Sequence, residues 1–174
     1  MYRAVTCAAL QRNIAPDDRG QVAELARELT LDVQLDNVLI DGVDVTAAIR
    51  TPEITAAVSA VAANSGVRAE MRARQRAWAV ARGGGVIEGR DIGSVVFPEA
   101  ELKLYLTASP RTRAQRRVAE FGGDVDEIEQ AIVARDHYDS SRADSPLTTA
   151  HGSIVVDTTG LDIDEVLAKI EALL

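Results

Sequence analysis

Cysteine, lysine and aromatic residues are all scarce in this chain, and each shortage narrows what the protein can be. The single cysteine, Cys7, allows no internal disulfide, which is typical of a reducing cytoplasm, and we predict that it is a small buried hydrophobic residue. The two histidines lie far from it, so a zinc site is not credible. No apolar run approaches the length of a membrane span, and no charged-then-apolar leader opens the chain. We therefore expect a cytoplasmic protein with no membrane partner.

The charge balance excludes one class of ligand and favours another. A net charge of −8 argues against a nucleic-acid polymer as partner, because binding a phosphate backbone requires a basic face. Only Lys103 and Lys169 are lysines, so almost all of the 19 basic residues are arginine. The planar guanidinium group binds phosphate or carboxylate through two parallel hydrogen bonds. Arginines gathered in an acidic protein therefore predict a site for a small phosphorylated molecule.

The first half of the sequence predicts helices interrupted by a β-rich stretch, roughly residues 29–50. Within it, two short apolar runs alternate around Asp36-Asn37 as hairpin strands do, and Asp41-Gly42 signals a second turn. Thr51-Pro52-Glu53 carries the capping hydroxyl, first-turn proline and early acid of a helix start. Apolar periodicity predicts the other elements of this half and places a stripe of core residues on its last helix, 67–82. The predicted helices are 2–11, 21–29, one from Thr51 to a break at Asn64, and 67–82 with Val67, Met71 and Trp78 as core; the predicted strands are 31–35 and 38–40.

The second half alternates strands with helices, which is typical of a parallel α/β sheet. The triple glycine 83–85 ends the preceding helix and is not followed by lysine, so we interpret it as a terminator and not as a phosphate-binding loop. Ser109-Pro110 begins a helix, and Asp124 with Glu127 predicts a capping box for the next one. The predicted strands are 85–87, 102–106 and 153–157, and the last helix, from Asp162, is predicted to bury Ile163, Val166, Leu167, Ile170 and Leu173.

Two charged clusters stand out against this framework. Residues 88–91 place a carboxylate, an arginine and a second carboxylate at the end of the predicted strand 85–87. In open α/β sheets, ligands bind beyond the carboxyl ends of such strands. The second cluster, residues 135–142, continues the helix face that carries Ile128 and Ile132. Together they predict a pocket for a small anion, and the alternative for either cluster alone is a solvated surface with ion pairs.

An ordered set of motifs runs through essentially the whole chain. It consists of Tyr2-Arg3, Asp41-Gly-Val-Asp-Val-Thr, Ile49-Arg-Thr-Pro-Glu-Ile, Val67-Arg68, Arg74-Gln-Arg, Glu88-Gly-Arg-Asp-Ile-Gly-Ser-Val-Val-Phe-Pro, Arg113-Ala-Gln-Arg-Arg, and Arg135-Asp-His-Tyr-Asp-Ser-Ser-Arg with Pro146-Leu147. In this order the motifs resemble the bacterial cytidylate kinases. The resemblance implies an α/β, parallel-sheet P-loop nucleoside monophosphate kinase fold in one domain, residues 1–174, truncated at its N-terminus. It also implies a small β-rich inserted NMP-binding subdomain, 29–82, and a lid-like helical region, 109–142.

The resemblance implies that individual residues bind CMP or dCMP. The implied substrate-binding residues are Arg3, Arg90 and Arg142 for the phosphate, Ser59, Arg68 and Asp91 for the cytosine, and Arg135 and Asp139 for the sugar. A hydroxyl, a guanidinium and a carboxylate suit the carbonyl, ring nitrogen and amine of cytosine.

The resemblance further implies transfer of the γ-phosphoryl group of ATP, with ATP as co-substrate and Mg²⁺ as cofactor. The candidate catalytic residues are Arg90, Arg113, Arg116, Arg117 and Arg142, of which the middle three belong to a lid that closes over ATP and binds its phosphates. Their contribution would be positioning and charge neutralisation. Glu88 is a weaker candidate for orienting a magnesium-bound water.

Each of these roles has a simpler alternative. Arg3 lies near the start of the chain, where a solvated side chain is common. Ser59 lies on an alanine-rich helix, where a small polar residue is often passive. The arginine face 113–117 has the composition of a solvated face, and Arg74 and Arg76 fit ion-paired surface groups.

One part of the family pattern is absent from these 174 residues. The family begins with a strand, a glycine-rich loop ending in Gly-Lys-Ser/Thr, a helix and a second strand, but here no lysine follows a glycine. That loop supplies the cradle for the β-phosphate and a magnesium ligand. The missing strand would lie between strands 85–87 and 102–106, so we expect unpaired ladder groups and exposed apolar faces. We expect that Met1 is an internal methionine of a longer reading frame, or that the gene is truncated.

Three functional hypotheses follow. The first is a (d)CMP kinase whose sequence is incomplete, the second a non-catalytic CMP-binding remnant, and the third a gene-model fragment without independent function. Adenylate and uridylate kinases are the alternatives within the enzyme class, although Ser59, Arg68, Asp91 and the β-rich insert favour cytosine. We expect small nucleotides as the only partners, and a monomer.

Overall fold

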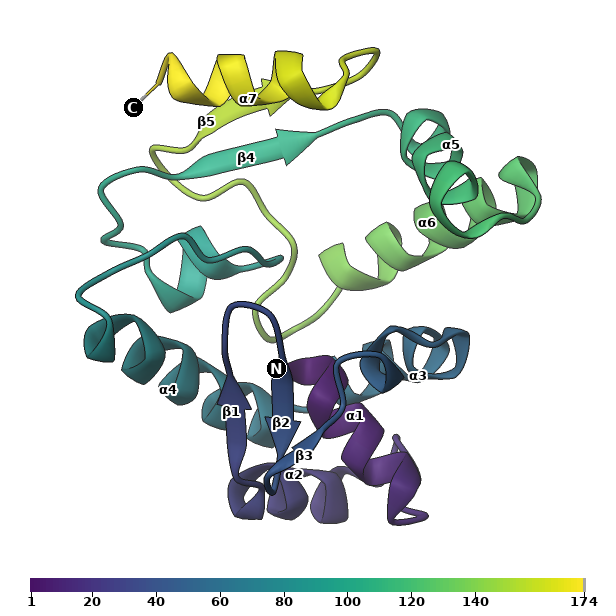
Figure 1. Ribbon diagram of the computed structural model, residues 1–174, viewed down its shortest axis with the longest axis vertical. Coiled ribbons are helices and arrows are strands. Elements are labelled where there is room, and N and C mark those ends of the chain that lie inside the picture. Colours follow the sequence, from purple (N-terminus) through teal and green to yellow (C-terminus); the bar gives the residue numbers. More distant parts are fainter. Residues whose placement is uncertain (174) are drawn as a thin grey trace. The chain divides into compact units, whose positions relative to one another are not determined.

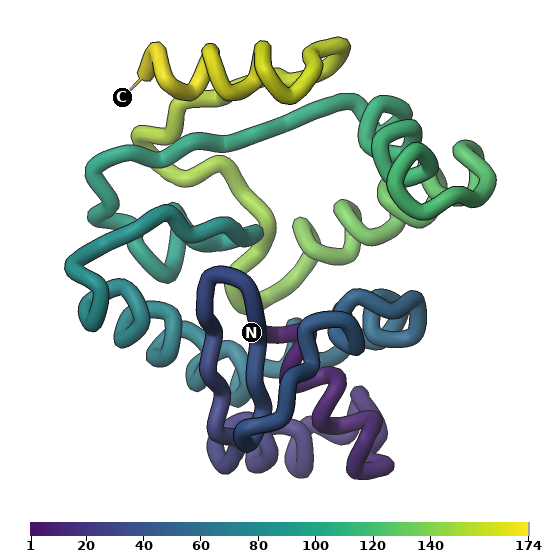
Figure 2. The backbone as a smooth tube through the Cα atoms, viewed as in Figure 1, coloured from purple at the N-terminus to yellow at the C-terminus, as the bar shows by residue number. Residues whose placement is uncertain are grey.

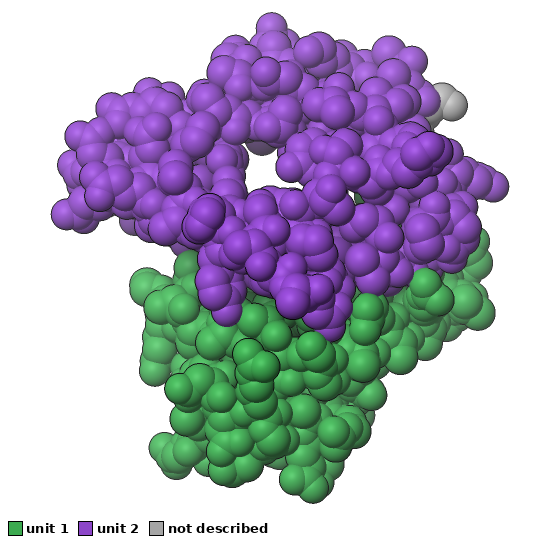
Figure 3. All heavy atoms as spheres, turned by 180° about the vertical axis from the view of Figure 1, so that it is seen from behind, with its two compact units in different colours: residues 1–86 green, residues 87–174 purple. Residues whose placement is uncertain are grey.

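The computed structural model describes residues 1–173 and divides after Val86 into two compact units (Figure 3). Unit 1, residues 1–86, contains α1 (Tyr2–Gln11), α2 (Arg19–Glu28), β1 (Leu31–Val33), β2 (Val38–Ile40), β3 (Val43–Asp44), the 3-10 helix η1 (Ala48–Arg50), α3 (Pro52–Ala62) and α4 (Ser65–Ala81) (Figure 1). Unit 2, from residue 87 on, contains the π-helix η2 (Ile92–Val96), β4 (Leu104–Thr107), α5 (Pro110–Phe121), α6 (Val125–Ser140), β5 (Ile154–Asp157) and α7 (Ile163–Glu171). The division into an insert at 29–82 and a lid at 109–142 stays a prediction.

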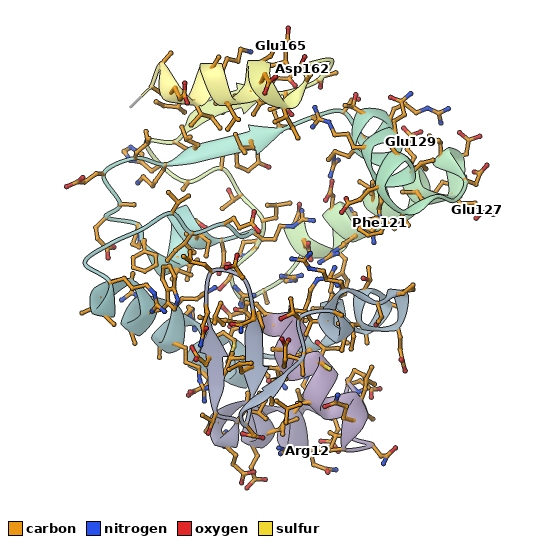
Figure 4. The ribbon with its side chains drawn as sticks, viewed as in Figure 1. Arg12, Phe121, Glu127, Glu129, Asp162 and Glu165 are labelled. Carbon is orange, nitrogen blue, oxygen red and sulfur yellow. The ribbon has the colours of Figure 1, made fainter. Side chains whose placement is uncertain are left out.

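Side-chain caps begin the helices where the sequence predicts them. The hydroxyl of Thr51 accepts the Ile54 amide of α3, and that of Ser109 accepts the Thr112 amide of α5. At Asp124 only the first half of the predicted capping box forms, in which its carboxylate accepts from the amides of residues 126 and 127. The complete box lies at α7, where Asp162 and Glu165 bond each other's backbone amides (Figure 4).

The hydrophobic core of unit 1 forms around α1. From Ala4 to Ala9 this helix is buried, and Cys7 is buried as predicted. It packs against α2, α3 and η1, while β1, β2 and β3 form an antiparallel sheet. Val67 and Met71 of α4 are fully buried, as predicted, but Trp78 is only half-buried, and its Nε1 donates to the Val33 carbonyl at 3.0 Å. Trp78, the last residue of the predicted core stripe of α4, is therefore not a core residue, and its hydrogen bond joins α4 to the hairpin.

The contact between α2 and α4 depends on a glycine. A Cβ at Gly66 would lie 2.7 Å from the Cβ of Ala23. We expect Gly66→Ala to lower the free energy of unfolding, because overpacking costs about 1–3 kcal/mol and exceeds the helix-propensity gain of at most about 1 kcal/mol. Gly20→Ala is the matched control: Gly20 is also the second residue of its helix, but its nearest neighbour is 3.6 Å away. Urea unfolding measures both, and a stabilising Gly66→Ala would contradict the close packing.

The sheet of unit 2 has two parallel strands among the described residues. β4 pairs with β5 in the register Leu104↔Ile154 to Thr107↔Asp157, which confirms the parallel α/β class. The predicted strand 85–87 is wrong: the residues have no strand structure, and Val86 is 98% exposed. The physical reason is that a strand needs a partner for its backbone groups, and no described strand lies beside this segment.

The predicted burial of α7 is also wrong. Ile163 is 77% exposed and Leu167 is 51% exposed, while Val166 and Ile170 are half-buried and Leu173 is exposed. On the strands, Leu106 and Val155 are more than half exposed as well. A two-stranded sheet has too little area to cover an amphipathic helix, and this leaves apolar surface exposed on both α7 and the strands.

Two packed helices, α5 and α6, carry many of the charged residues of unit 2. The chain turns back at Gly122, whose φ of 76° is easily adopted by glycine, so that α5 and α6 lie side by side (Figure 2). Ala114 is fully buried in α5, whereas most polar side chains of the pair face outward or line the cavity described below. Of the helices within residues 1–173, none combines the length and apolarity that crossing a bilayer requires.

Candidate functional site

A cavity of about 320 Å³ lies in unit 2, between α5, α6 and the segment before η2. This volume falls at the lower end of the range for small-molecule sites. Phe121, at the end of α5 (Figure 4), and Ile132 supply its apolar wall. The charged lining residues are Arg90, Arg113, Arg116, Arg117 and Arg135, with the carboxylates of Glu120 and Asp136. The surplus of guanidinium groups gives this cavity a positively charged lining, which suits an anion.

A buried carboxylate organises one side of this arginine cluster. Asp139 is fully buried, and its Oδ1 accepts a hydrogen bond from the guanidinium of Arg142, whose side chain is 8% exposed. Its Oδ2 lies 3.6 Å from Nε of Arg90 and 3.8 Å from Nε of Arg135, without a hydrogen-bond partner. One carboxylate therefore holds three of the predicted arginines in one place, and one of its oxygens can still accept a hydrogen bond.

A second carboxylate, Asp136, one turn earlier on α6, connects two walls of the cavity. Its Oδ1 accepts from Nη1 of Arg90 at 3.0 Å, and its Oδ2 lies 2.6 Å from Nη1 of Arg113. Arg113 is also fixed by its Nε, which donates to the Ala108 carbonyl at 3.1 Å. Sequence reasoning missed Asp136, although its place directly after Arg135 in a charged helix was a usable signal.

The electrostatics of Arg135 reflect the positive surroundings. Burial lowers the pKa of Arg135 from its ordinary value, and the nearby charges of Arg90 and Arg117 lower it further, while Asp136 acts in the opposite direction. The guanidinium nevertheless stays charged, because arginine does not deprotonate in proteins. Because neighbouring guanidinium groups repel one another here, binding of an anion at this site is electrostatically favourable.

Arg116 differs from its two neighbours on α5. Its guanidinium donates to Oγ1 and the carbonyl of Thr158 at 3.1 and 2.7 Å, and to the Leu161 carbonyl at 3.0 Å. These bonds hold the turn between β5 and α7. Arg116 lines the cavity, but its hydrogen bonds to Thr158 and Leu161 are those of a structural residue.

The residues of the segment before η2 differ in how well the structure supports their predicted roles. Asp91 is buried, and its backbone carbonyl accepts from the amides of Val95 and Val96 in the π-helix. Glu88 is exposed and follows no strand, so the reason for placing it at a strand end is gone. The structure thus supports Arg90 and Asp91 as positioned groups and gives no support to Glu88.

In unit 1, the first turn of α1 contacts α3 and α4, the helices that carry Ser59 and Arg68. Arg3 donates from Nη1 to the Ile49 carbonyl and to Oγ1 of Thr55, both at 2.9 Å. It is therefore anchored and not the solvated residue that its position near the start suggested. Thr55 lies one helical turn before the half-buried Ser59 on α3.

Arg68 is the buried cation of unit 1. Only 2% of it is exposed; its Nη1 donates to the Ala62 carbonyl at 3.1 Å, and its guanidinium lies 5.6 Å from the centre of the Tyr2 ring. Because Tyr2 precedes Arg3, the start of α1 contacts both α3 and α4. Arg3, Ser59 and Arg68 belong to unit 1, and the other predicted residues to unit 2. That the two sets meet around one nucleotide stays a prediction.

Arg74 has a structural role that its sequence did not reveal. It pairs with Glu70 at 2.7 Å, as a surface ion pair would. It also donates to the carbonyls of Ala26, Arg27 and Leu29, which end α2. Arg74 therefore caps the C-terminus of α2 across the helix pair, which is favourable for a cation at that end.

The described residues offer no protein site for a metal ion. Within residues 1–173, no three histidine, cysteine or carboxylate side chains gather closely enough to hold one. The arginine cavity fits the phosphates of a nucleotide, which its donors suit, but it does not fit a cation.

Known proteins match this chain over nearly its whole length. The cytidylate kinase family model matches residues 1–174. The cytidylate kinase of Limosilactobacillus reuteri strain DSM 20016 is 44% identical over 184 residues, covering 100% of this chain and 80% of the relative. Those of Desulfitobacterium hafniense strain Y51 and Desulforamulus reducens strain MI-1 are 45% and 46% identical, covering 99% and 98% of this chain and 78% and 80% of the relatives. Because the family model and these relatives match the chain over nearly all its residues, the chain belongs to the cytidylate kinase family.

Proposed function

We propose that this chain recognises CMP or dCMP as the acceptor for the γ-phosphoryl group of ATP, giving CDP or dCDP. In this proposal Arg90 and Arg142 hold the acceptor phosphate with Arg3, and Arg113 and Arg117 neutralise the phosphates of ATP. Ser59, Arg68 and Asp91 read the cytosine. The magnesium ion is taken as part of the ATP substrate.

The observation that carries the proposal is the buried carboxylate of Asp139. It neutralises Arg142 through one oxygen, while the other lies near Arg90 and Arg135 without a hydrogen bond. A buried acceptor without a donor is rare in a folded protein. A nucleotide supplies such a donor in its sugar hydroxyl. The hydroxyl can reach Oδ2 of Asp139 when Arg90 and Arg135, which lie near that oxygen, move toward the nucleotide's phosphate. A nucleoside monophosphate therefore satisfies both the cations and the carboxylate.

The chemistry that these residues perform is positioning and neutralisation. In phosphoryl transfer, charge spreads over the equatorial oxygens of the transferred group, and the protein stabilises it with fixed donors. Arg90 and Arg113 line one cavity from different elements, so they can face the acceptor and the donor phosphate respectively. No side chain needs to form a covalent bond.

We further propose that the 174-residue chain by itself binds CMP without turning it over. These residues contain no glycine-rich loop ending in Lys-Ser or Lys-Thr, which in such kinases cradles the β-phosphate. The donor phosphates would then bind the arginines but lack the backbone donors that align them for attack. Alignment of this kind accounts for a large part of the rate.

Two measurements on the same preparation test the proposal. Calorimetric titration is expected to show CMP and dCMP binding about tenfold or more tightly than AMP or UMP, because a polar base site left unpaired is costly. A coupled assay with ATP and CMP is expected to show no ADP release above background. Absence of CMP binding would overturn the acceptor assignment, whereas CMP-dependent ADP release would overturn only the statement about turnover. An in-frame Gly-Lys-Ser/Thr segment in the DNA upstream of Met1 would support the longer reading frame.

A further inference from the structure

The bridge formed by Asp136 is the feature that the acceptor assignment does not use. This carboxylate binds Arg90 with one oxygen and Arg113 with the other, so it occupies the same guanidinium edges that a phosphate would. Its two partners come from different elements, the segment before η2 and helix α5. Asp136 thus lies where an anionic ligand of the cavity is expected to lie.

The surroundings distinguish Asp136 from Asp139. The side chain of Asp139 is fully buried, whereas that of Asp136 is 27% exposed, and its partners Arg90 and Arg113 are 39% and 31% exposed. A carboxylate in this partly open position can leave its partners and be solvated at little cost. Asp139 cannot do so, because a buried charge without a partner is strongly unfavourable. Asp139 therefore suits a permanent structural ion pair, whereas Asp136 suits one that can open.

Because arginines outnumber carboxylates in the cavity, Asp136 can leave Arg90 and Arg113 favourably only when another anion binds them. Five arginines line the cavity against two carboxylates, one of which is Asp136. Asp136 also opposes the repulsion that Arg90 and Arg117 exert on Arg135. In the ligand-free protein its loss would leave the guanidinium groups facing one another. A polyphosphate brings more negative charge than the carboxylate and can replace it.

We infer that Asp136 is a replaceable counter-anion, which pairs Arg90 with Arg113 in the ligand-free protein and releases both to nucleotide phosphates, Arg90 to the acceptor phosphate and Arg113 to the polyphosphate of ATP. The inference rests on the proposed function, since it names the ligand class of the same cavity. Asp136 acts through the two arginines, so it is a positioning residue and not a catalytic one. Its removal should strengthen polyphosphate binding, whereas removal of a merely structural bridge should weaken it.

The test is a calorimetric titration of the 174-residue chain and its variants with inorganic tripolyphosphate. Asp136→Asn is expected to bind about 3- to 10-fold more tightly than wild type at low ionic strength, because a competing negative charge within a few ångströms is gone. The difference should shrink toward 1 M salt, where the screening length falls to about 3 Å. Asp136→Glu keeps the charge and should restore the wild-type affinity.

Asp126→Asn is the matched control. Asp126 also joins α6 to α5, because it pairs with Arg111 of α5. Arg111 pairs as well with Glu129 of α6 at 3.1 Å (Glu129 is labelled in Figure 4). None of these three residues lines the cavity. Its tripolyphosphate affinity is expected to equal that of wild type. Tripolyphosphate should also raise the melting temperature of Asp136→Asn more than that of wild type, since a tighter ligand stabilises more.

A measurement on wild type keeps the test valid if Asp136→Asn does not fold. Carboxyl-carbon NMR follows the surroundings of Asp136, whose carboxyl chemical shift is expected to move when tripolyphosphate binds, because the carboxylate loses its contacts with Arg90 and Arg113. Asp126 should not respond. Unchanged or weaker binding by Asp136→Asn, or an unmoved Asp136 in saturated wild type, would overturn the inference. If wild type itself binds neither CMP nor tripolyphosphate, the proposed function fails instead.

Discussion

Replacing Asp139 by asparagine is expected to lower the free energy of unfolding by about 3–5 kcal/mol, the cost of leaving a buried charge uncompensated. Asp139 is fully buried, and Arg142, which it neutralises, is 8% exposed. An asparagine can accept a hydrogen bond from Arg142 but supplies no negative charge for Arg90 and Arg135. Urea unfolding followed by circular dichroism measures the loss. CMP binding should be lost in the same variant, because the arginines that hold the phosphate are no longer positioned.

Two further variants separate charge from packing at this site. Asp136→Asn removes a carboxylate from the same helix, but its partly exposed position predicts a loss of only about 1 kcal/mol or less. Asp139→Leu combined with Arg142→Met removes both charges and should recover part of the stability lost in Asp139→Asn. Equal losses in Asp136→Asn and Asp139→Asn would contradict the distinction between the two carboxylates. Fluorescence of Trp78, the single tryptophan, reports on unit 1 and serves as an internal reference.

Arg90→Met is expected to weaken CMP binding about 10- to 100-fold, since a hydrogen bond to a charged group contributes about 1.5–3 kcal/mol. Its side chain is partly exposed in the cavity and is paired with Asp136 and Asp139. The free energy of unfolding should change little, because Arg90 is itself partly exposed and the buried Asp139 keeps its hydrogen bond from Arg142. Calorimetry with CMP and urea unfolding measure the two quantities on one preparation.

Arg116→Met should show the opposite pattern. Its guanidinium makes three hydrogen bonds to Thr158 and Leu161, which hold the turn before α7. Losing them is expected to cost about 1–3 kcal/mol of stability, while CMP affinity stays near that of wild type. If Arg116→Met weakens CMP binding as strongly as Arg90→Met, Arg116 is a ligand of the acceptor and the structural interpretation is wrong.

Local chemistry was enough to predict most helices and turns. The helix over 2–11 has the predicted bounds, and Thr51, Ser109 and Asp162 cap helices where their side chains and the following prolines or acids indicated. The hairpin around Asp36-Asn37 was predictable as well. These features depend on residues within about four positions of each other, so the information lies in a short stretch of chain.

The failures concern elements that need a distant partner. The apolar run 85–87 has the composition of a strand, but a strand forms only when another offers its backbone groups. The apolar face of α7 has the right period, yet the two strands β4 and β5 offer too little surface to cover it. Trp78 belongs to the predicted stripe but lies where the hairpin carbonyl of Val33 can accept its N–H.

For the site, residue types and spacing indicated an arginine-rich anion site, because guanidinium groups have few other uses at such density in an acidic chain. Folding determined which arginine does what. Arg74 and Arg116 hold backbone carbonyls of other elements, Arg90 and Arg113 face one cavity, and Asp136 joins them. A guanidinium group carries the same charge wherever it lies, and its task depends on whether a carbonyl, a carboxylate or open space is within 3 Å. That is set by contacts between residues some 20 to 50 positions apart, which no local pattern encodes.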